Sequence, residues 1–354
     1  MINYFVICLC LAVSLILLQT SSVVNSGMAG VQTIELLDGN HMPAIALGTY
    51  LGYDQNGIVK PKNNEFRDVI ARAIDLGYRH FDTAAIYGTE EELGKGIKIK
   101  IDEGVVKRED IFVTTKLWNT SHRKDEVEPA LRESLRRLSL DYVDLYLMHW
   151  PIGLNPDYTY SDVDYLDTWA AMEDVQRKSL TRSIGISNFN QNQIERLLTK
   201  CNVQPVALQI EVHIQLPQTG LVAYAQKSNI TVMGYSPFGS LVQRPGFQHS
   251  VPSILNAVLS GMADKYKKTQ RQIVLRWLMD RNIVAIPKTV TQKRLEENID
   301  IFDFKLKRDE IEAINGCHGE TTRYTLPSFW QNHPYYPFER VENPVADPFK
   351  TRAM

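Results

Sequence analysis

Four ionisable side chains stand at the ends of three short apolar segments of this sequence. Asp82 ends one segment and Tyr87 follows it in the next loop, while Lys116 and His149 end the two segments that come after. Short apolar runs between turn residues predict buried β-strands. If these strands run parallel, their ends share one edge, and a carboxylate, a phenol, an ammonium and an imidazole would form an acid–base site there.

Tyr87 is the candidate general acid of this set. A free phenol titrates near ~10 and is a poor proton donor at neutral pH, whereas an adjacent ammonium lowers its pKa. Lys116 would supply that charge, Asp82 would hold the lysine protonated and oriented, and His149 would donate to a carbonyl oxygen. Such a set protonates a carbonyl oxygen while hydride reaches the carbon. Each residue taken singly also has a non-catalytic alternative. A loop tyrosine such as Tyr87 can serve packing, a strand-end aspartate such as Asp82 can cap a helix, and a histidine such as His149 can occupy a satisfied position in the core.

Eight short apolar segments alternate with amphipathic helical stretches. They cover residues 45–48, 80–84, 111–115, 143–148, 183–188, 207–211, 231–236 and 283–288. This alternation predicts an α/β fold in which an all-parallel sheet closes into a (β/α)8 TIM barrel, with function in the loops that follow the strands. An open doubly wound sheet is the alternative, but it would have a GxGxxG motif after its first strand, and none occurs there.

Two local signals lie at the start of the barrel. Residues 31–47 contain two short apolar runs around Asp38-Gly39-Asn40, which predicts an N-terminal β-hairpin cap. Asn64 is of a residue type that caps helices, and residues 66–74 follow it with helical spacing of apolar side chains.

The charge composition argues against nucleic-acid binding, and the N-terminal segment suggests that the protein is secreted. With 39 basic and 41 acidic residues among 354, nucleic-acid binding has no electrostatic support. Residues 4–18 are almost continuously apolar, which suits a secretory signal peptide over residues 1–26, with cleavage as late as 29. We therefore expect a secreted single domain over 27–354 without stable membrane association. An uncleaved anchor, or an extended N-terminus on a cytoplasmic protein, is the alternative.

Two cysteines and two glycosylation sequons are relevant to whether the chain is secreted. Cys201 and Cys317 are far apart in sequence and outside any metal-spaced cluster, so both are expected to be free thiols and no metal site is expected. Asn119 and Asn229 begin Asn-X-Ser/Thr sequons, which matter only if the chain enters the secretory pathway.

The later strands add features suited to a nucleotide. Lys288, Thr289 and Arg294 lie between the last strand and the next helix, a position suited to a phosphate, although a solvated basic helix start is the alternative. Tyr235 could stack on a planar heterocycle or pack. Ser187, Asn188 and Gln209 could hydrogen-bond a carboxamide or satisfy backbone groups.

Together these motifs resemble the aldo-keto reductase superfamily. The matching stretches, in order, read GYRHFDTAAIYGTEEELG, TTKLWNTSH, YLMHWP, RSIGISNF, LQIEVH, GYSPFG and IPKTVTQKRLEEN, and they extend over residues 31–338. The resemblance implies that Asp82, Tyr87, Lys116 and His149 are a catalytic tetrad. It also implies NADPH/NADP⁺ as cofactor rather than NADH.

The resemblance assigns the cofactor contacts residue by residue. Ser187, Asn188 and Gln209 would bind the nicotinamide amide, Tyr235 would stack on its ring, and the loop from Ser236 to Leu241 would close over the pyrophosphate. Lys288, Thr289 and Arg294 would clasp the adenosine 2′-phosphate, with Glu297 and Asn298 at the adenine.

By family position, the substrate pocket would be lined by Tyr50, Trp118, Trp150 and a C-terminal substrate loop over residues 326–338 that contains Trp330. Such a wall favours a bulky apolar carbonyl compound. A reductase with a secretory signal further resembles exported 3-dehydroecdysone 3β-reductases. The alternatives are a broad-specificity aldehyde/ketone reductase and a non-catalytic NADPH-binding channel accessory or structural protein. A monomer is expected.

Overall fold

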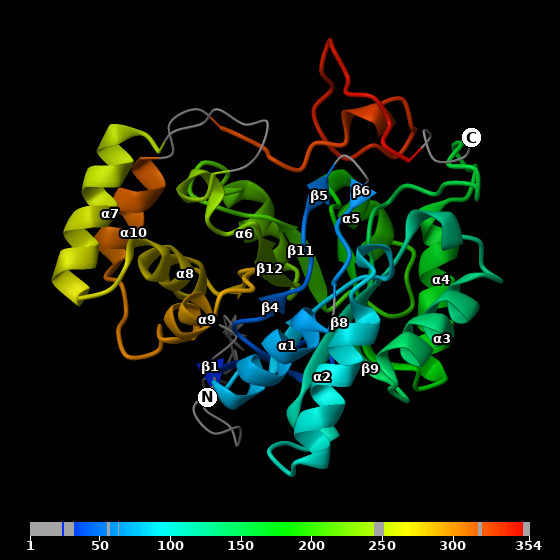
Figure 1. Cartoon of the computed structure of the whole chain (residues 1–354). Helices are drawn as coiled ribbons and strands as arrows, with labels where there is room; N and C mark the ends of the chain where they lie inside the picture. The colour runs from blue at the N-terminus through cyan, green and yellow to red at the C-terminus, as the bar shows by residue number, and fades with distance from the viewer. Residues whose placement is uncertain are drawn as a thin grey trace, which may run out of the picture.

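The computed structural model describes residues 23–24, 32–54, 57–62, 64–243, 251–317 and 321–349 (Figure 1). Apart from Val23–Val24, the expected signal peptide and its cleavage site lie outside these residues. Val23–Val24 form a short strand, β1, that pairs antiparallel with β2 (Thr33–Glu35). No described helix combines the length and the apolar character that are needed to cross a bilayer.

Eight strands form one barrel, as predicted. The neighbours in this sheet follow the order β13-β12-β11-β10-β9-β8-β7-β4, and every pair is parallel. Bridges from Ile45 to Ala285 and from Gly48 to Lys288 join the first strand to the last. The strands are β4 (Leu47–Gly48), β7 (His80–Asp82), β8 (Phe112–Leu117), β9 (Val143–Met148), β10 (Thr181–Ser187), β11 (Ala207–Glu211), β12 (Thr231–Tyr235) and β13 (Ile283–Ile286).

Amphipathic helices surround the barrel (Figure 1). In α3, Val127, Leu131, Leu135 and Leu138 are buried at helical spacing, which is the pattern that predicted this helix. The helices around the barrel are α1 (Glu65–Asp75), α2 (Glu90–Asp102), α3 (Val127–Leu138), α4 (Tyr165–Arg177), α5 (Gln191–Leu198), α6 (Thr219–Lys227), α8 (Gln270–Asp280) and α9 (Gln292–Ile299).

Two further helices lie side by side at one flank of the barrel, α7 (Ser253–Tyr266) and α10 (Arg308–Gly316) (Figure 1). Glu310 of α10 accepts hydrogen bonds from Lys265 at 2.5 Å and from Tyr266 at 2.6 Å, both on α7. Asn64 occupies the N-cap position of α1, as expected. Asn64 has a φ of 60°, and its side chain makes no capping hydrogen bond.

The predicted N-terminal hairpin consists of β2 and β3 (His41–Pro43), joined by a turn in which Gly39 has a φ of 82°. Two side chains of this turn, Asp38 and Asn40, hydrogen-bond the hydroxyl of Ser183 near the start of β10, at 2.7 Å and 3.1 Å. The hairpin is thereby fixed at the end of the barrel from which the strands begin.

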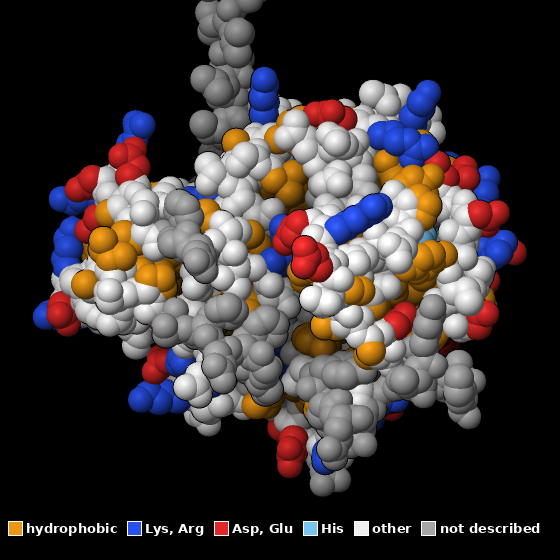
Figure 2. All heavy atoms as spheres, turned by 90° about the horizontal axis from the view of Figure 1, so that it is seen from above, with side chains coloured by type: hydrophobic (Ala, Val, Ile, Leu, Met, Phe, Trp, Pro, Cys, Tyr) orange, Lys and Arg blue, Asp and Glu red, His pale blue; other side chains and the backbone are white. Residues whose placement is uncertain are grey.

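The opposite end of the barrel is covered by the C-terminal segment. Residues 321–349, which include the 3-10 helix η5 (Ser328–Trp330), cross above the ends of the strands (Figure 1). A small hairpin of β5 (Tyr53–Asp54) and β6 (Gly57–Ile58), which the sequence did not reveal, lies on the same side. Seen from above, this face carries hydrophobic side chains between charges of both signs (Figure 2).

Candidate active site

Asp82 and Lys116 form a fully enclosed ion pair at the ends of two adjacent strands, β7 and β8. The Lys116 side chain is 0% exposed, and its Nζ donates to Asp82 Oδ1 at 2.8 Å and to the carbonyl oxygen of Thr83 at 2.8 Å. The other carboxylate oxygen accepts from Gln209 Nε2 at 2.6 Å. Burial lowers the pKa of Lys116, although the charge of Asp82 opposes that shift.

Tyr87 lies beside this pair, at the end of the 3-10 helix η1 (Ala85–Tyr87). Lys116 Nζ lies 4.9 Å from the centroid of the Tyr87 ring. Burial, assisted by the charge of Asp82, raises the pKa of Tyr87 well above the usual phenol value. The expected lowering of this pKa by Lys116 is therefore wrong, because the lysine charge is paired with Asp82, and burial together with the charge of Asp82 raises the pKa.

His149 completes the cluster directly after β9. Its ring centroid is 5.7 Å from that of Tyr87 and 5.3 Å from that of Trp118. Burial and the nearby charge of Lys116 lower the pKa of His149 well below its ordinary value, so the imidazole is neutral at physiological pH. Its Nδ1 is enclosed without a hydrogen-bond partner in the described chain, which leaves Nε2 as the nitrogen that can reach a substrate.

A row of polar side chains continues from this cluster across β10, β11 and β12. Asn188, with a φ of 62°, donates to the carbonyl oxygen of His149 at 3.0 Å and accepts from the Tyr235 hydroxyl at 2.8 Å. The Ser187 hydroxyl donates to the carbonyl oxygen of Gln209 at 2.9 Å. The structure brings these four residues to one rim, where each has an internal partner, and their contact with a nicotinamide stays a prediction.

The predicted phosphate-binding residues gather after β13. Partial burial and the positive charge of Arg294 lower the pKa of Lys288. Neither cation forms an ion pair with a described residue, whereas the neighbouring Lys293 lies 3.9 Å from Glu297. Asn298 is 2% exposed, and its Nδ2 has no hydrogen-bond partner in the described chain. Two adjacent unpaired cations and an orphaned amide fit an anionic, hydrogen-bonding ligand.

The loop expected over the pyrophosphate starts at Ser236, with a φ of 54°, and contains the short helix η4 (Gly239–Leu241). It approaches the barrel closely at Gly239, where an added Cβ would lie 2.8 Å from Nδ1 of His213. Leu241 is half-buried against the core. On the far side of the rim, Thr289 is buried and its hydroxyl accepts from the backbone N–H of Thr291 at 3.1 Å.

The four predicted substrate residues lie on the tetrad side of the barrel mouth. Tyr50 is 40% exposed, with its ring centroid 5.0 Å from that of Tyr87. The buried rings of Trp118, Trp150 and Trp330 form an aromatic cluster next to His149, with centroids 6.0 Å apart for Trp118 and Trp330 and 5.7 Å apart for Trp150 and Trp330.

Sequence reasoning missed three supporting groups. The buried hydroxyl of Thr89 lies 2.8 Å from that of Thr49 and 3.0 Å from that of Thr83, the residue whose carbonyl accepts from Lys116. Glu211 accepts from His213 at 2.9 Å and joins β11 to the C-terminal segment. Phe349, far beyond the matched motifs, packs on the aromatic cluster. Glu211 and His213 lie in the motif LQIEVH, and Thr83 and Thr89 lie in GYRHFDTAAIYGTEEELG, but the spacing of these residues did not indicate their contacts. Thr49 and Phe349 lie outside the quoted motifs.

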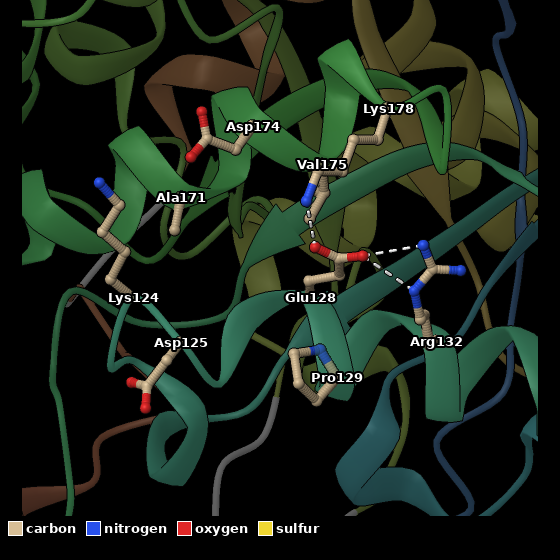
Figure 3. A pocket seen from close by; sticks show the side chains of 9 residues that line it. All are labelled: Lys124, Asp125, Glu128, Pro129, Arg132, Ala171, Asp174, Val175 and Lys178. Carbon is tan, nitrogen blue, oxygen red and sulfur yellow. Dashed lines mark hydrogen bonds and ion pairs between the residues drawn. The ribbon is translucent and has the colours of Figure 1, made fainter.

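A surface hollow between α3 and α4 lies outside this site (Figure 3). Glu128 of α3 accepts from Lys178 at 2.5 Å across it, and from Arg132 of its own helix at 2.9 Å. Two of its cations, Arg132 and Lys178, are paired with Glu128, and the hollow lies between helices on the outside of the barrel, away from the strand ends that carry the tetrad.

Comparison with known proteins agrees with this geometry. The Aldo/keto reductase family model matches residues 44–318. Aldo-keto reductase AKR2E4 of Bombyx mori is 46% identical over 304 residues, covering 86% of this chain and 97% of the relative. Its crystal structure in complex with NADP has a TM-score of 0.81, at 45% identity over 86% of this chain and 98% of that chain.

Two other proteins extend the comparison. The crystal structure of aldo-keto reductase AKR2E5 complexed with NADPH has a TM-score of 0.86, at 42% identity over 91% of this chain and 98% of that chain. Estradiol 17 beta-dehydrogenase 5 of Mus musculus is 38% identical over 321 residues, covering 87% of this chain and 97% of the relative. A family model that spans most of the barrel, with relatives matched over nearly their full length, leads to one conclusion: the chain belongs to the aldo/keto reductase family.

Proposed function

We propose that this protein reduces a carbonyl compound to an alcohol with NADPH, and that Tyr87 is the general acid. The observation that carries the proposal is geometric: a buried Lys116–Asp82 pair, the Tyr87 phenol and the His149 imidazole meet at one barrel mouth. Tyr87 keeps its proton at neutral pH, and the ammonium of Lys116, 4.9 Å from the centroid of its ring, would stabilise the phenolate that forms as the proton passes to an oxygen on which negative charge develops.

The roles of the remaining residues follow from their contacts. Lys116 is held by Asp82 and the Thr83 carbonyl, so it acts by charge and position and not as a nucleophile. His149, being neutral, would donate a hydrogen bond from Nε2 and orient the carbonyl oxygen. When bound, NADPH supplies the hydride that reaches the carbonyl carbon, which together with the tyrosine proton balances the reduction.

The chain offers groups that fit this cofactor. Lys288 and Arg294 are adjacent cations without a described ion-pair partner, which suits the 2′-phosphate that distinguishes NADPH from NADH. The enclosed Nδ2 of Asn298 suits an acceptor nitrogen of the adenine. AKR2E4 and AKR2E5, solved with NADP and NADPH, support the same choice.

For the substrate, we propose a bulky apolar ketone of the 3-dehydroecdysone kind. The aromatic cluster of Trp118, Trp150 and Trp330 supplies a wide apolar wall beside His149. The similarity to a mouse enzyme named for estradiol supports a steroid-sized compound. Faster turnover of simple aldehydes, with no steroid ketone reduced, would instead indicate a broad-specificity reductase.

The decisive experiment replaces the acid alone. In Tyr87→Phe, we expect kcat for carbonyl reduction to fall at least about 100-fold, the lower end of what general acid catalysis contributes, while NADPH affinity changes little. NADPH binding is measured by quenching of intrinsic fluorescence and turnover by NADPH absorbance. Tyr142→Phe is the control, because Tyr142 directly precedes β9, at the end of the barrel opposite the tetrad. Near-normal turnover in Tyr87→Phe would refute the assignment.

We also propose that the chain is secreted after cleavage near residue 26. The apolar stretch of residues 4–18 supports this, and N-terminal sequencing of the mature protein tests it. Of the two sequons, Asn119 is 0% exposed in the folded barrel, whereas Asn229 is exposed in the turn before β12 with a φ of 57°. A glycan on the secreted protein is therefore expected at Asn229 only.

A further inference from the structure

Several enclosed polar atoms around His149 lack a hydrogen-bond partner in the described chain. They are Nδ1 of His149 itself, both ring nitrogens of His122, both polar atoms of the Asn119 side chain, and the indole N–H groups of Trp118 and Trp330. Asn119 is 0% exposed and His122 is 1% exposed. Leaving a buried polar group unpaired is costly, so native proteins contain few of them. Their concentration in one place indicates a partner that they share.

The backbone that carries Asn119 and His122 is well fixed. Asn119 begins the 3-10 helix η3 (Asn119–Ser121), which follows β8, and His122 comes directly after it. The N–H of Leu154, in the loop after β9, donates to the Asn119 carbonyl oxygen at 2.8 Å. The Thr168 hydroxyl on α4 donates to the His122 carbonyl oxygen at 2.9 Å. The main chain of this turn is thus hydrogen-bonded on two sides, while its two polar side chains remain for another partner.

This turn lies close to the candidate proton site. The Trp118 ring, one residue before the turn, has its centroid 5.3 Å from that of His149. A Cβ built on Gly153, four residues after His149, would lie 3.6 Å from Cβ of His122. Burial and the charges of Lys116 and His122 together lower the pKa of His149, which also places His122 near that ring.

The proton of the His149 imidazole has to lie on the correct nitrogen. A neutral imidazole carries one proton, and the group that faces one nitrogen decides which of the two carries it. To donate to a carbonyl oxygen from Nε2, His149 must present Nδ1 as an acceptor, and Nδ1 then requires a donor. Buried water makes about three hydrogen bonds to otherwise unpaired polar groups, so it can donate to Nδ1 while bonding the neighbouring side chains.

We propose that Asn119 and His122 are positioning residues that hold ordered water against Nδ1 of His149, and that this water keeps the imidazole proton on Nε2. The inference rests on the proposed reductase function, in which Nε2 orients the carbonyl oxygen. Asn119 and His122 act through His149 and touch neither substrate nor cofactor. The turn after β8 therefore contributes to the reaction through the side chains that follow Trp118, in addition to the Lys116 ammonium.

The test uses the full-length protein loaded with NADP⁺. Asn119→Leu and His122→Phe each replace a polar side chain by an apolar one of similar size, whereas His122→Gln keeps a donor and an acceptor at that position. Lys124→Ala, at an exposed position two residues further along the chain, is the control. Nitrogen NMR of the ¹⁵N-histidine-labelled protein reports the state of both His149 nitrogens, whose signals are assigned by their loss in His149→Gln.

In the wild type, His122→Gln and Lys124→Ala, we expect Nε2 to be protonated and Nδ1 to accept a hydrogen bond. In Asn119→Leu and His122→Phe, the Nδ1 resonance should move toward that of a nitrogen that accepts none. An Nδ1 resonance that stays unchanged in both apolar variants would overturn the inference. Should one of the two fail to fold, the other decides alone.

Kinetics separate a positioning role from a structural one. We expect kcat/KM for benzaldehyde with NADPH to fall about three- to tenfold in His122→Phe, as for the loss of one hydrogen bond, with recovery in His122→Gln. In a His149→Gln background, His122→Phe should cause no further loss, because the two residues act as one unit. Equal losses in both backgrounds would contradict the inference. If the wild type reduces no carbonyl compound, the reductase proposal fails instead, and the NMR measurement still tests the water site.

Discussion

Asp82 organises the candidate site by using both of its carboxylate oxygens. One accepts from Lys116 and the other from Gln209, and all three side chains are buried. This arrangement explains why the lysine does not lower the pKa of Tyr87: a paired ammonium presents little net charge to its neighbour, whereas burial acts in full on the phenol. Tyr87 therefore holds its proton until a substrate oxygen can take it.

The strongest residue-scale prediction concerns the two cations after β13. Replacing Lys288 and Arg294 by alanine should weaken NADPH binding by roughly 10- to 100-fold per residue, since a hydrogen bond to a charged group contributes about 1.5–3 kcal/mol. The affinity for NADH, which lacks the 2′-phosphate, should change little. Lys293→Ala is the control, because Lys293 is exposed and 3.9 Å from Glu297. Equal losses for both nucleotides, measured by fluorescence titration, would contradict the assignment.

Residue types at strand ends were enough to predict which side chains meet. Asp82, Lys116 and His149 each end or follow a buried strand, and a parallel barrel brings such positions to one rim. The hydrogen-bond partners were not predictable, because they depend on rotamers and distances. The hydrogen bond that Gln209 donates to Asp82 is one example, while its predicted contact with a carboxamide stays a prediction. The direction of the Tyr87 pKa shift required the burial that only the folded chain defines.

At the scale of elements, Glu211 joins three segments. Its carboxylate accepts from His213 at 2.9 Å and from the backbone N–H groups of Tyr324 and Thr325 at 2.8 Å and 2.7 Å. Burial alone would raise the pKa of Glu211, but these hydrogen bonds outweigh it and lower the pKa. The imidazole of His213 in turn lies against Gly239. One carboxylate thus positions the start of the C-terminal segment beside the loop after β12.

We therefore expect Glu211→Gln to loosen the C-terminal segment. An amide NH2 would replace an acceptor opposite a buried backbone donor, which costs about 1–3 kcal/mol. The urea midpoint should fall, proteolytic cleavage within residues 321–326 should accelerate, and the KM for the carbonyl compound should rise. Glu195→Gln, at an exposed position on α5, should change none of these. Cleavage at the wild-type rate would show that Glu211 does not anchor the segment.

The repeating elements were predictable and the irregular ones were not. Strands such as β8 and β9 are short, mainly apolar or β-branched runs that are buried along their whole length, and α3 has a clear helical spacing, so local patterns defined them. The hairpin of β5 and β6 has only two residues in each strand. The path of residues 321–349 depends on contacts such as Gln331 with Val341, which no local pattern encodes.

For the whole molecule, the two ends of the barrel are covered by different segments of the chain. The hairpin of β2 and β3 closes the end where strands begin, and the C-terminal segment covers the end that carries the ionisable groups. Buried histidines occur toward both ends: His80 bonds the Pro43 carbonyl near the hairpin, and His122 lies close enough to His149 to affect its pKa. The acid stability of the barrel therefore depends on both ends together.

Burial lowers the pKa of His80 to about 4 and that of His122 to about 3. In the unfolded chain both titrate near ~6.5, so the unfolded state binds more protons as the pH falls below that value. The contribution of the two histidines to the free energy of unfolding is fully present above pH ~6.5. As the pH falls toward the pKa values of the folded protein, this contribution is lost at about 1.4 kcal/mol per pH unit for each histidine. Urea unfolding at pH 7.5 and pH 5.0 measures this loss.

His122→Gln isolates one of these contributions. Both ring nitrogens of His122 lack a hydrogen-bond partner among the described residues, so the neutral ring is held by its enclosure. We expect the variant to lose less stability than the wild type between the two pH values, by about 2 kcal/mol, because glutamine takes up no proton on unfolding. Carboxylates titrate alike in both proteins, so they cancel in the difference. An identical pH dependence in the two proteins would mean that His122 is protonated in the native barrel.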